Sequence, residues 1–345
     1  MSVTGSDTGN WVNVDTQESA ASRPVILQVK NLRVHYATPT GDVIAVNGGY
    51  LNVYEGETVG LVGESGCGKT TMAMGILRLV QPPGRIVHGE VVINGLDLVP
   101  LEEAQLREVR WKQISLIPQG AMNSLNPVMR IRNQVTDGMR AHRPEMSRQE
   151  LEARVFETLE MVGLEREVAS MYPHELSGGM KQRVCVAIAI SLHPKVIIAD
   201  EPTSALDVVV QRQVMETMVE LYEQLGAAVV LIGHDMGLMA QFAERLAVMY
   251  AGRLVEVGGI REVFHDPLHP YTRLLIDSVP LLDEKGSFRG IPGLTPSLLH
   301  VPPGCNFHPR CPTAREGCAE QVPSLVEVAP NRWVACHSPS PAVST

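Results

Sequence analysis

A glycine-rich stretch near residue 60 carries the clearest chemistry in the chain. An apolar run over residues 59–62 leads into Gly63, and four residues later come Gly68, Lys69 and Thr70. This spacing fits a phosphate-binding loop, in which glycines let backbone N–H groups turn inward around an anion at the start of a helix. Lys69 would reach the β- and γ-phosphates of a nucleotide, and the Thr70 hydroxyl would bind Mg²⁺. The stretch therefore predicts a strand, a phosphate-binding loop and a helix.

Polar side chains also follow two later apolar runs. Asp200 and Glu201 come directly after residues 196–199, and His234 follows residues 227–232. Ligands of open parallel sheets bind beyond the carboxyl ends of the strands. We therefore expect these side chains and the phosphate-binding loop to converge.

The elements that must position these residues alternate between strand and helix. We expect strands at 25–36, 43–53, 90–94, 114–118, 196–199, 227–232, 246–250 and 254–257. Helices are expected at 70–80, 102–111, 131–164, 177–192 and 208–225. Apolar strands that alternate with helices predict an α/β fold with a largely parallel sheet covered on both faces. Residues 120–176 interrupt the alternation and are expected to form an inserted helical subdomain.

Length and charge restrict the function classes. A chain of 345 residues fits one large α/β domain with a smaller appendage. The chain has 29 Lys and Arg residues against 38 Asp and Glu residues and lacks a basic block, which argues against nucleic acid as the main partner. Residues 1–22 are polar and without periodicity, so a disordered leader is expected there rather than a signal peptide. No apolar run approaches the roughly 18 residues of a membrane-spanning helix, so a cytosolic protein that reaches a membrane only through another subunit is expected.

Taken in order, these segments resemble the nucleotide-binding subunit of an ATP-binding cassette (ABC) transporter. The resemblance runs from about Ile26 to Val257 and rests on the ordered set Tyr36, 63–70, Gln119, Leu176-Ser177-Gly178-Gly179, Asp200-Glu201, Ser204-Ala205-Leu206-Asp207 and His234. It implies the P-loop NTPase fold of ABC ATPases: a RecA-like, mostly parallel sheet, an antiparallel β subdomain and an inserted helical subdomain. The expected division is a leader at 1–22, the nucleotide-binding domain at 23–265 and a small Cys-rich extension at 266–345.

The resemblance also implies a role for each residue of the site. Glu201 would act as general base, His234 would stabilise charge at the γ-phosphate, and Gln119 would sense the metal and the nucleophile, with Lys69 completing the catalytic set. Thr70, Gln119 and Asp200 would hold Mg²⁺. The nucleotide-binding set is Tyr36, Gly63, Ser65, Gly66, Cys67, Gly68, Lys69, Thr70, Thr71, Gln119, Ser177, Gly178, Gly179, Asp207 and His234. Tyr36 could stack on adenine or serve as a core tyrosine, and the sequence leaves both open.

The same resemblance implies that the site is shared between two subunits. Ser177, Gly178 and Gly179 would bind the γ-phosphate of ATP held by the opposite subunit of a head-to-tail dimer, with Asp207 near the interface. Each catalytic position carries the residue that the family uses, so a hydrolysis-competent ATPase is expected.

The C-terminal quarter resembles the tail of the dipeptide, oligopeptide and nickel importer ATPases. The segments concerned are His269-Pro270-Tyr271, Ile291-Pro292-Gly293 and residues 304–312, and the loop at 119–127 also fits that group. This implies an ATPase subunit at the cytoplasmic face of a bacterial membrane. Its partners would be a similar but non-identical ATPase, two permease subunits docking on the exposed apolar residues of that loop, and indirectly an extracellular binding protein. Peptides are the first expected substrate; nickel chelates, oligosaccharides and a soluble ABC ATPase uncoupled from transport are the alternatives.

Four of the six cysteines cluster in this tail, at Cys305, Cys311, Cys318 and Cys336. Clustered thiols in a reducing compartment suggest metal more than disulfides, and the short Cys-x2–4-Cys pairs of zinc ribbons are missing. Relatives with the same four cysteines carry a [4Fe–4S] cluster, for which all-thiolate ligation is suitable. Zinc and free thiols remain alternatives, and His337 could replace one ligand.

Overall fold

The computed structural model describes residues 23–120, 123–204, 206–278 and 290–339. The expected leader at 1–22 lies outside these residues, as do residues 121–122 of the expected docking loop and Ala205 of the segment before Asp207. In the described part, no helix has the length and apolar character needed to cross a bilayer.

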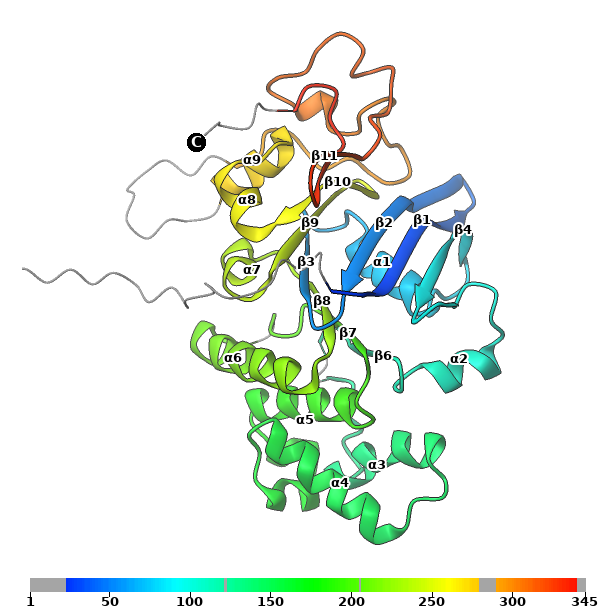
Figure 1. Cartoon of the computed structure of the whole chain (residues 1–345), viewed down its shortest axis with the longest axis vertical. Coiled ribbons are helices and arrows are strands. Elements are labelled where there is room, and N and C mark those ends of the chain that lie inside the picture. Colours follow the sequence, from blue (N-terminus) through cyan, green and yellow to red (C-terminus); the bar gives the residue numbers. More distant parts are fainter. Residues whose placement is uncertain (1–22, 121–122, 205, 279–289, 340–345) are drawn as a thin grey trace, which may run out of the picture.

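The described strands form two sheets (Figure 1). The four-stranded antiparallel sheet has the order β2 (Gly41–Tyr54), β1 (Val25–Thr38), β4 (Gly84–Ile93) and β5 (Leu96–Asp97). The eight-stranded sheet has the order β11 (Val326–Ala329), β12 (Arg332–Val334), β10 (Arg253–Gly259), β9 (Arg245–Tyr250), β3 (Thr58–Val62), β8 (Ala228–Ile232), β7 (Val196–Asp200) and β6 (Ile114–Ile117). From β9 to β6 all neighbours are parallel, and β10, β12 and β11 add to this sheet in antiparallel fashion. The expected combination of a mostly parallel sheet with an antiparallel β subdomain is confirmed.

The parallel strands are buried on both faces. In β7, Ile197 and Ala199 pack into the core that includes the helical subdomain, whereas Val196 and Ile198 pack into the core shared with the antiparallel sheet. Successive side chains of a strand point to opposite faces, so a strand between two cores is apolar at every position. This explains why these strands appear in the sequence as continuous apolar runs.

Helices cover the sheet and build the inserted subdomain. They are α1 (Lys69–Ile76), α2 (Glu103–Val109), α3 (Ile131–His142), α4 (Arg148–Met161), α5 (Gly178–Ile190), α6 (Val208–Leu225), α7 (Met236–Phe242), α8 (Ile260–His265) and α9 (Pro270–Asp277), with 3₁₀ turns at Arg166–Ser170, Pro173–Glu175 and His308–Arg310. Helices α3 and α4 lie at the end of the molecule opposite the C-terminal extension (Figure 1).

The expectation of one continuous helix over 131–164 is wrong. The chain leaves the helix after His142 and starts again at Arg148. Pro144 has no N–H to donate, and Ser147 caps α4 by accepting a hydrogen bond from the Glu150 N–H (3.2 Å). The Glu150 carboxylate accepts in turn from the Ser147 N–H (2.7 Å), which completes a capping box.

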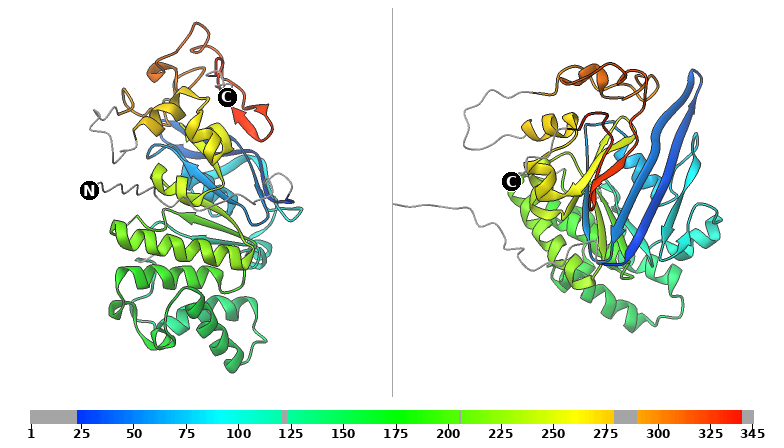
Figure 2. Two further views of the ribbon diagram at one scale, coloured as in Figure 1. Left: turned by 60° about the vertical axis from the view of Figure 1, so that its left-hand side comes forward. Right: turned by 45° about the horizontal axis from the view of Figure 1, so that its top comes forward.

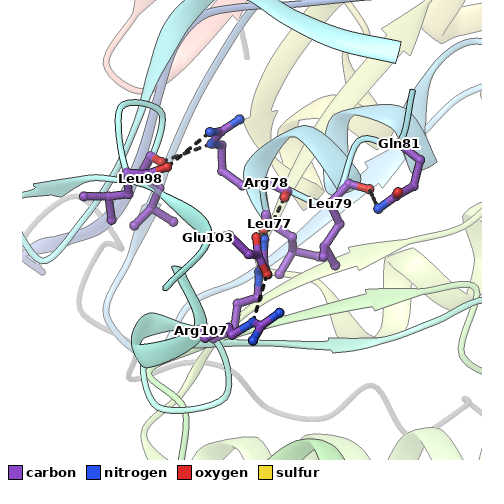
Figure 3. Close-up of polar contacts among 9 residues, drawn as sticks. Leu77, Arg78, Leu79, Gln81, Leu98, Glu103 and Arg107 are labelled. Carbon is purple, nitrogen blue, oxygen red and sulfur yellow. Dashed lines mark hydrogen bonds and ion pairs between the residues drawn. The ribbon is translucent and has the colours of Figure 1, made fainter. Parts of the chain in front are cut away.

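Helix α1 ends four residues before the predicted Val80. Arg78 adopts a left-handed conformation with φ of 56°, which a continuing helix does not allow. Its guanidinium donates to the Leu98 carbonyl (3.2 Å) and so ties the end of α1 to the chain that enters α2 (Figure 3).

The C-terminal extension is joined to the main sheet through a buried ion pair. Strand β12 pairs with β10, as the red hairpin in Figure 2 shows, and Arg332 donates to the Glu256 carboxylate (2.8 Å). The same carboxylate accepts from the N–H groups of Leu268 and His269 (both 2.9 Å) just before α9. The extension therefore continues the fold of the nucleotide-binding domain.

Candidate nucleotide-binding site

The phosphate-binding loop follows β3 and is closely packed on its inner side. A Cβ on Gly63 (φ 150°) would lie 2.1 Å from the Met249 carbonyl oxygen, and a Cβ on Gly68 (φ 111°) would lie 2.2 Å from that of Ala45. Both positions therefore require glycine. The Lys69 ammonium lies inside the turn and donates to the Gly63 carbonyl (2.7 Å).

The outer side of the loop is open. Ser65, Gly66 and Thr70 are exposed, and a Cβ on Gly66 would meet no atom within 4 Å. Cys67 is buried, and this burial raises the pKa of its thiol. Thr71 is half-buried on the first turn of α1. This open face at a helix N-terminus can accept an anion.

Asp200 lies at the end of β7 with a buried carboxylate. Both carboxylate oxygens are buried, and neither accepts a hydrogen bond from any described residue. Burial raises the pKa of Asp200, while the nearby Thr70 hydroxyl and, more weakly, the Lys69 ammonium oppose this rise. A buried carboxylate without partners is costly unless a cation compensates it. Asp200 and Thr70 together fit a site for a hard cation such as Mg²⁺.

Glu201 is held between two side chains that arrive from neighbouring strands. Its Oε2 accepts a hydrogen bond from the Gln119 amide (2.8 Å), and its Oε1 lies 3.2 Å from Nδ1 of His234. The residue is left-handed (φ 44°), and its N–H donates to the Ile232 carbonyl (2.9 Å). The structure thus brings together the predicted residues at the carboxyl ends of β6, β7 and β8.

The signature residues lie apart from this group, at the start of α5. Ser177 caps the helix by accepting a hydrogen bond from the Met180 N–H (3.3 Å). Gly178 is exposed, and Gly179 packs so closely on Val210 of α6 that an added Cβ would lie 2.9 Å from it. Among the described residues, no hydrogen bond or ion pair links positions 177–179 to the phosphate-binding loop.

Asp207 caps the neighbouring helix α6. Its side chain accepts a hydrogen bond from the N–H of Val210 (3.0 Å), and the residue itself is exposed. Val208 and Val209, the first residues of α6, are 81% and 67% exposed. Two exposed valines beside the signature helix form an apolar surface that is not covered within the described chain.

Two other predicted positions have a clear place in the fold. The Tyr36 ring packs closely on Gly84 of β4, at the edge of the core shared with the antiparallel sheet. This contact does not test whether Tyr36 stacks on adenine or serves as a core tyrosine. The expectation that Leu125 is one of the exposed apolar residues of the docking loop is wrong. Leu125 is 6% exposed and packs in the core. Val128, at the end of this loop, is 80% exposed.

The four clustered cysteines line a common cavity of about 20 Å³. All four are free thiols; burial raises the pKa of Cys305 and of Cys336, and the neighbouring thiols raise both further. Four soft donors around one cavity suit a thiolate-bound metal in their chemistry. In the part of the chain that the structure describes, however, no three His, Cys, Asp or Glu side chains are arranged to hold a metal ion. His337, which also lines this cavity, donates a hydrogen bond from Nε2 to the Gln321 carbonyl (2.8 Å).

Comparison with known proteins decides the family. A model of the ABC transporter family matches residues 46–204, and a model of the C-terminal region of oligopeptide/dipeptide transporters matches residues 255–318. The oligopeptide transport ATP-binding protein OppD of Salmonella typhimurium strain LT2 is 44% identical over 329 residues, covering 93% of this chain and 97% of that protein. The chain belongs to the ABC transporter ATPases. The dipeptide transport ATP-binding protein DppD of Caldanaerobacter subterraneus is 41% identical over 315 residues, covering 91% of this ABC ATPase and 97% of its relative.

Solved structures agree with this assignment. The dimeric structure of the bacterial ABC transporter cassette MJ0796 superposes with a TM-score of 0.62 and 32% identity, covering 68% of this ABC ATPase and 99% of that chain. A post-hydrolysis state of the same cassette, bound to ADP and Pi, matches equally well. The expected ABC ATPase fold and the expected ATPase activity are confirmed.

Glu64 is not among the predicted site residues, since it occupies a position of the phosphate-binding loop where the motif accepts any residue. In the structure its backbone and its carboxylate both contact the C-terminal extension. No local pattern signals this, because the partners are 207 and 246 residues away.

Proposed function

We propose that this ABC ATPase hydrolyses MgATP at sites shared with a second subunit and so powers the import of peptides. The observation that carries the proposal is the Glu201 carboxylate, which lies between Gln119 and His234 and next to the buried carboxylate of Asp200. A positioned carboxylate beside a candidate cation site is what hydrolysis by an activated water needs.

The chain's own groups can carry each step. The loop N–H groups and Lys69 bind the phosphates, and Glu201 accepts a proton as a water oxygen attacks the γ-phosphorus. The bond between this phosphorus and the β–γ bridging oxygen breaks, and ADP leaves with that oxygen. His234 stabilises the charge on the transferred phosphoryl oxygens. Mg²⁺, held by Thr70 and Asp200 with Gln119 nearby, would neutralise phosphate charge and orient the oxygens.

The second subunit would complete each site. The exposed N-terminus of α5, with the Ser177 hydroxyl and the N–H groups of Gly178 and Gly179, suits a γ-phosphate presented by a partner. Asp207 and the exposed Val208 and Val209 lie beside it and would belong to the same interface. We propose a similar, non-identical ATPase as the partner.

The transport role rests on the C-terminal region and on the relatives' names. The relatives are named for oligopeptide and dipeptide transport, which favours peptides over nickel chelates or oligosaccharides as the substrate class. Two permease subunits would receive the loop that carries the exposed Val128, placing the ATPase at the cytoplasmic face of a bacterial membrane. An extracellular binding protein would deliver the peptide to the permease.

The four thiols that share one cavity would hold a [4Fe–4S] cluster with a structural role. Anaerobically purified protein is then expected to contain about four iron atoms per chain and to show the visible absorption of a cluster. Cys318→Ser should lower both signals, whereas Cys185→Ser, outside the cavity, should not. Stoichiometric zinc without iron, or no metal at all, would contradict this assignment.

The decisive experiment on hydrolysis is Glu201→Gln in the complex with its permease. The variant should bind ATP as the parent does, because glutamine keeps the size of the side chain and its contacts with Gln119. Phosphate release should fall by roughly 10²- to 10⁴-fold, the usual contribution of a general base. Glu108→Gln, an exposed change on α2, is the matched control. Undiminished phosphate release in Glu201→Gln would refute the role of Glu201.

A further inference from the structure

Two segments of the C-terminal extension converge on Glu64 of the phosphate-binding loop, and a third supports one of them. The Glu64 carboxylate pairs with Arg310 through two parallel hydrogen bonds, Nη1 to Oε2 (2.7 Å) and Nη2 to Oε1 (2.9 Å). The Glu64 N–H donates to the Tyr271 hydroxyl (2.9 Å). Backbone and side chain of Glu64 are therefore both held from outside the nucleotide-binding domain.

Arg310 is itself fixed in place. Its side chain is 6% exposed, its Nε donates to the Pro292 carbonyl (2.7 Å), and Nη1 also donates to the Tyr250 hydroxyl (3.2 Å). Gly293 (φ 75°) lets the backbone pass so closely that a Cβ there would lie 3.3 Å from Cγ of Arg310. The Ile-Pro-Gly segment thus supports the guanidinium that reaches Glu64.

Tyr271 is fixed by burial and by the start of α9. It is 0% exposed, and its ring lies 4.6 Å from that of Tyr250 and 5.3 Å from that of Phe307, centroid to centroid. His269 caps α9 by accepting from the Tyr271 N–H (3.0 Å), with Pro270 in the first turn. The His-Pro-Tyr segment therefore sets the position of a hydroxyl that accepts a loop N–H.

The loop residue that these groups hold is directly involved with Lys69. The Lys69 ammonium donates to the Glu64 carbonyl (3.1 Å) as well as to the Gly63 carbonyl. We propose that Tyr271 and Arg310 are positioning residues for the phosphate-binding loop, which act through Glu64 to set the affinity for nucleotide. This inference rests on the assignment of the loop as the ATP site.

The geometry makes this contact stronger than a surface ion pair. A bidentate arginine–carboxylate pair adds directional hydrogen bonds to charge, and the exposed fractions of 6% for Arg310 and 21% for Glu64 limit screening by solvent. The 3₁₀ turn that carries Arg310 begins three residues after Cys305 and is followed by Cys311, so the turn that contacts the loop also borders the thiol cavity. The extension is thereby a part of the ATP site as well as of the sheet.

The test measures the Kd of the full-length protein for a fluorescent ATP analogue. Arg310→Ala should raise the Kd about tenfold, the effect of losing a hydrogen bond to a charged group. Arg310→Lys should give a smaller rise, because lysine keeps the charge and loses the two parallel bonds. Tyr271→Phe removes only the hydroxyl and should raise the Kd several-fold.

Two control variants match these changes. Tyr222→Phe removes a buried hydroxyl that has no hydrogen-bond partner among the described residues, and Arg107→Ala removes the exposed partner of Glu103 (Figure 3). Both should leave the Kd unchanged. Amide hydrogen exchange over residues 63–70 should be faster in Tyr271→Phe than in Tyr222→Phe, a difference that a general loss of stability would not produce.

A double-mutant cycle separates positioning from an unrelated effect. If Arg310 acts through Glu64, then Arg310→Ala should add little to the Kd of Glu64→Ala. Additive effects of Arg310→Ala and Glu64→Ala on the Kd would overturn the proposal. A Kd that is unchanged in both Tyr271→Phe and Arg310→Lys would also overturn it. These two conservative variants decide the question even if Arg310→Ala does not fold. Failure of the parent protein to bind the analogue would instead contradict the assignment of the ATP site.

Discussion

His269 is expected to make the stability of the protein depend on pH. The residue is 1% exposed at the start of α9, where its Nδ1 accepts the Tyr271 N–H. Burial lowers the pKa of His269 to about 3. The imidazole is therefore neutral in the folded protein at any pH at which the protein is normally handled.

The sign and size of the effect follow from the two pKa values. The unfolded chain has a histidine pKa of about 6.5, so between about pH 6.5 and pH 3 the unfolded state binds one proton more than the folded state. Stability from this residue is therefore complete above pH 6.5 and decreases as the pH falls through this window. Between pH 7.5 and 5.5 the free energy of unfolding should fall by about 1.4 kcal/mol on account of His269 alone.

The assay compares the parent with His269→Asn by urea unfolding at pH 7.5 and pH 5.5. Asparagine can still accept the capping hydrogen bond, but it does not titrate. The parent should be the more stable protein at pH 7.5, and its advantage should shrink by about 1.4 kcal/mol at pH 5.5. All other titrating groups are common to both proteins and cancel in the difference. An advantage that is the same at both pH values would refute the reasoning, and the exposed His88→Asn serves as the control.

Two further changes test contacts at the two ends of β3. Arg245→Met removes the guanidinium that lies 2.9 Å from the fully buried Glu57 carboxylate. Because an unpaired buried charge remains, the free energy of unfolding should fall by about 3–5 kcal/mol. A decrease well under 1 kcal/mol, measured by urea unfolding, would contradict this prediction. Gly63→Ala places a Cβ 2.1 Å from the Met249 carbonyl oxygen and should abolish ATP binding by displacing the loop. A Kd for ATP equal to that of the parent would contradict the second prediction.

Elements whose ends are set by local chemistry were predicted well. Helix α6 spans Val208–Leu225 as expected, since Asp207 caps its start and Gly226 takes the left-handed conformation (φ 58°) that ends it. The parallel strands were equally visible, because burial on both faces makes them continuously apolar.

Elements that depend on distant contacts were missed. The hairpin β11–β12 is short, its strand β11 is exposed, and β12 is placed against β10 by the pair between Arg332 and Glu256, 76 residues apart. Leu125 lies in a loop that reads as polar, yet it packs into the core under the helical subdomain. Local periodicity predicts neither the place of this hairpin nor the burial of Leu125, because both depend on contacts between segments that are distant in the sequence.

The site shows the same division at the level of single residues. The meeting of Gln119, Glu201 and His234 could be predicted because each follows a strand of one parallel sheet, and such strands end at one edge. The role of Glu64 could not be predicted, because the motif allows any residue at its position and its contacts come from residues 271 and 310. A motif defines the groups that touch the phosphate, whereas the residues that hold those groups are chosen by the tertiary fold. The tail region that matches the oligopeptide/dipeptide transporter model has a structural role of this kind: His269, Pro270, Tyr271 and Arg310 form a support that ends on the phosphate-binding loop.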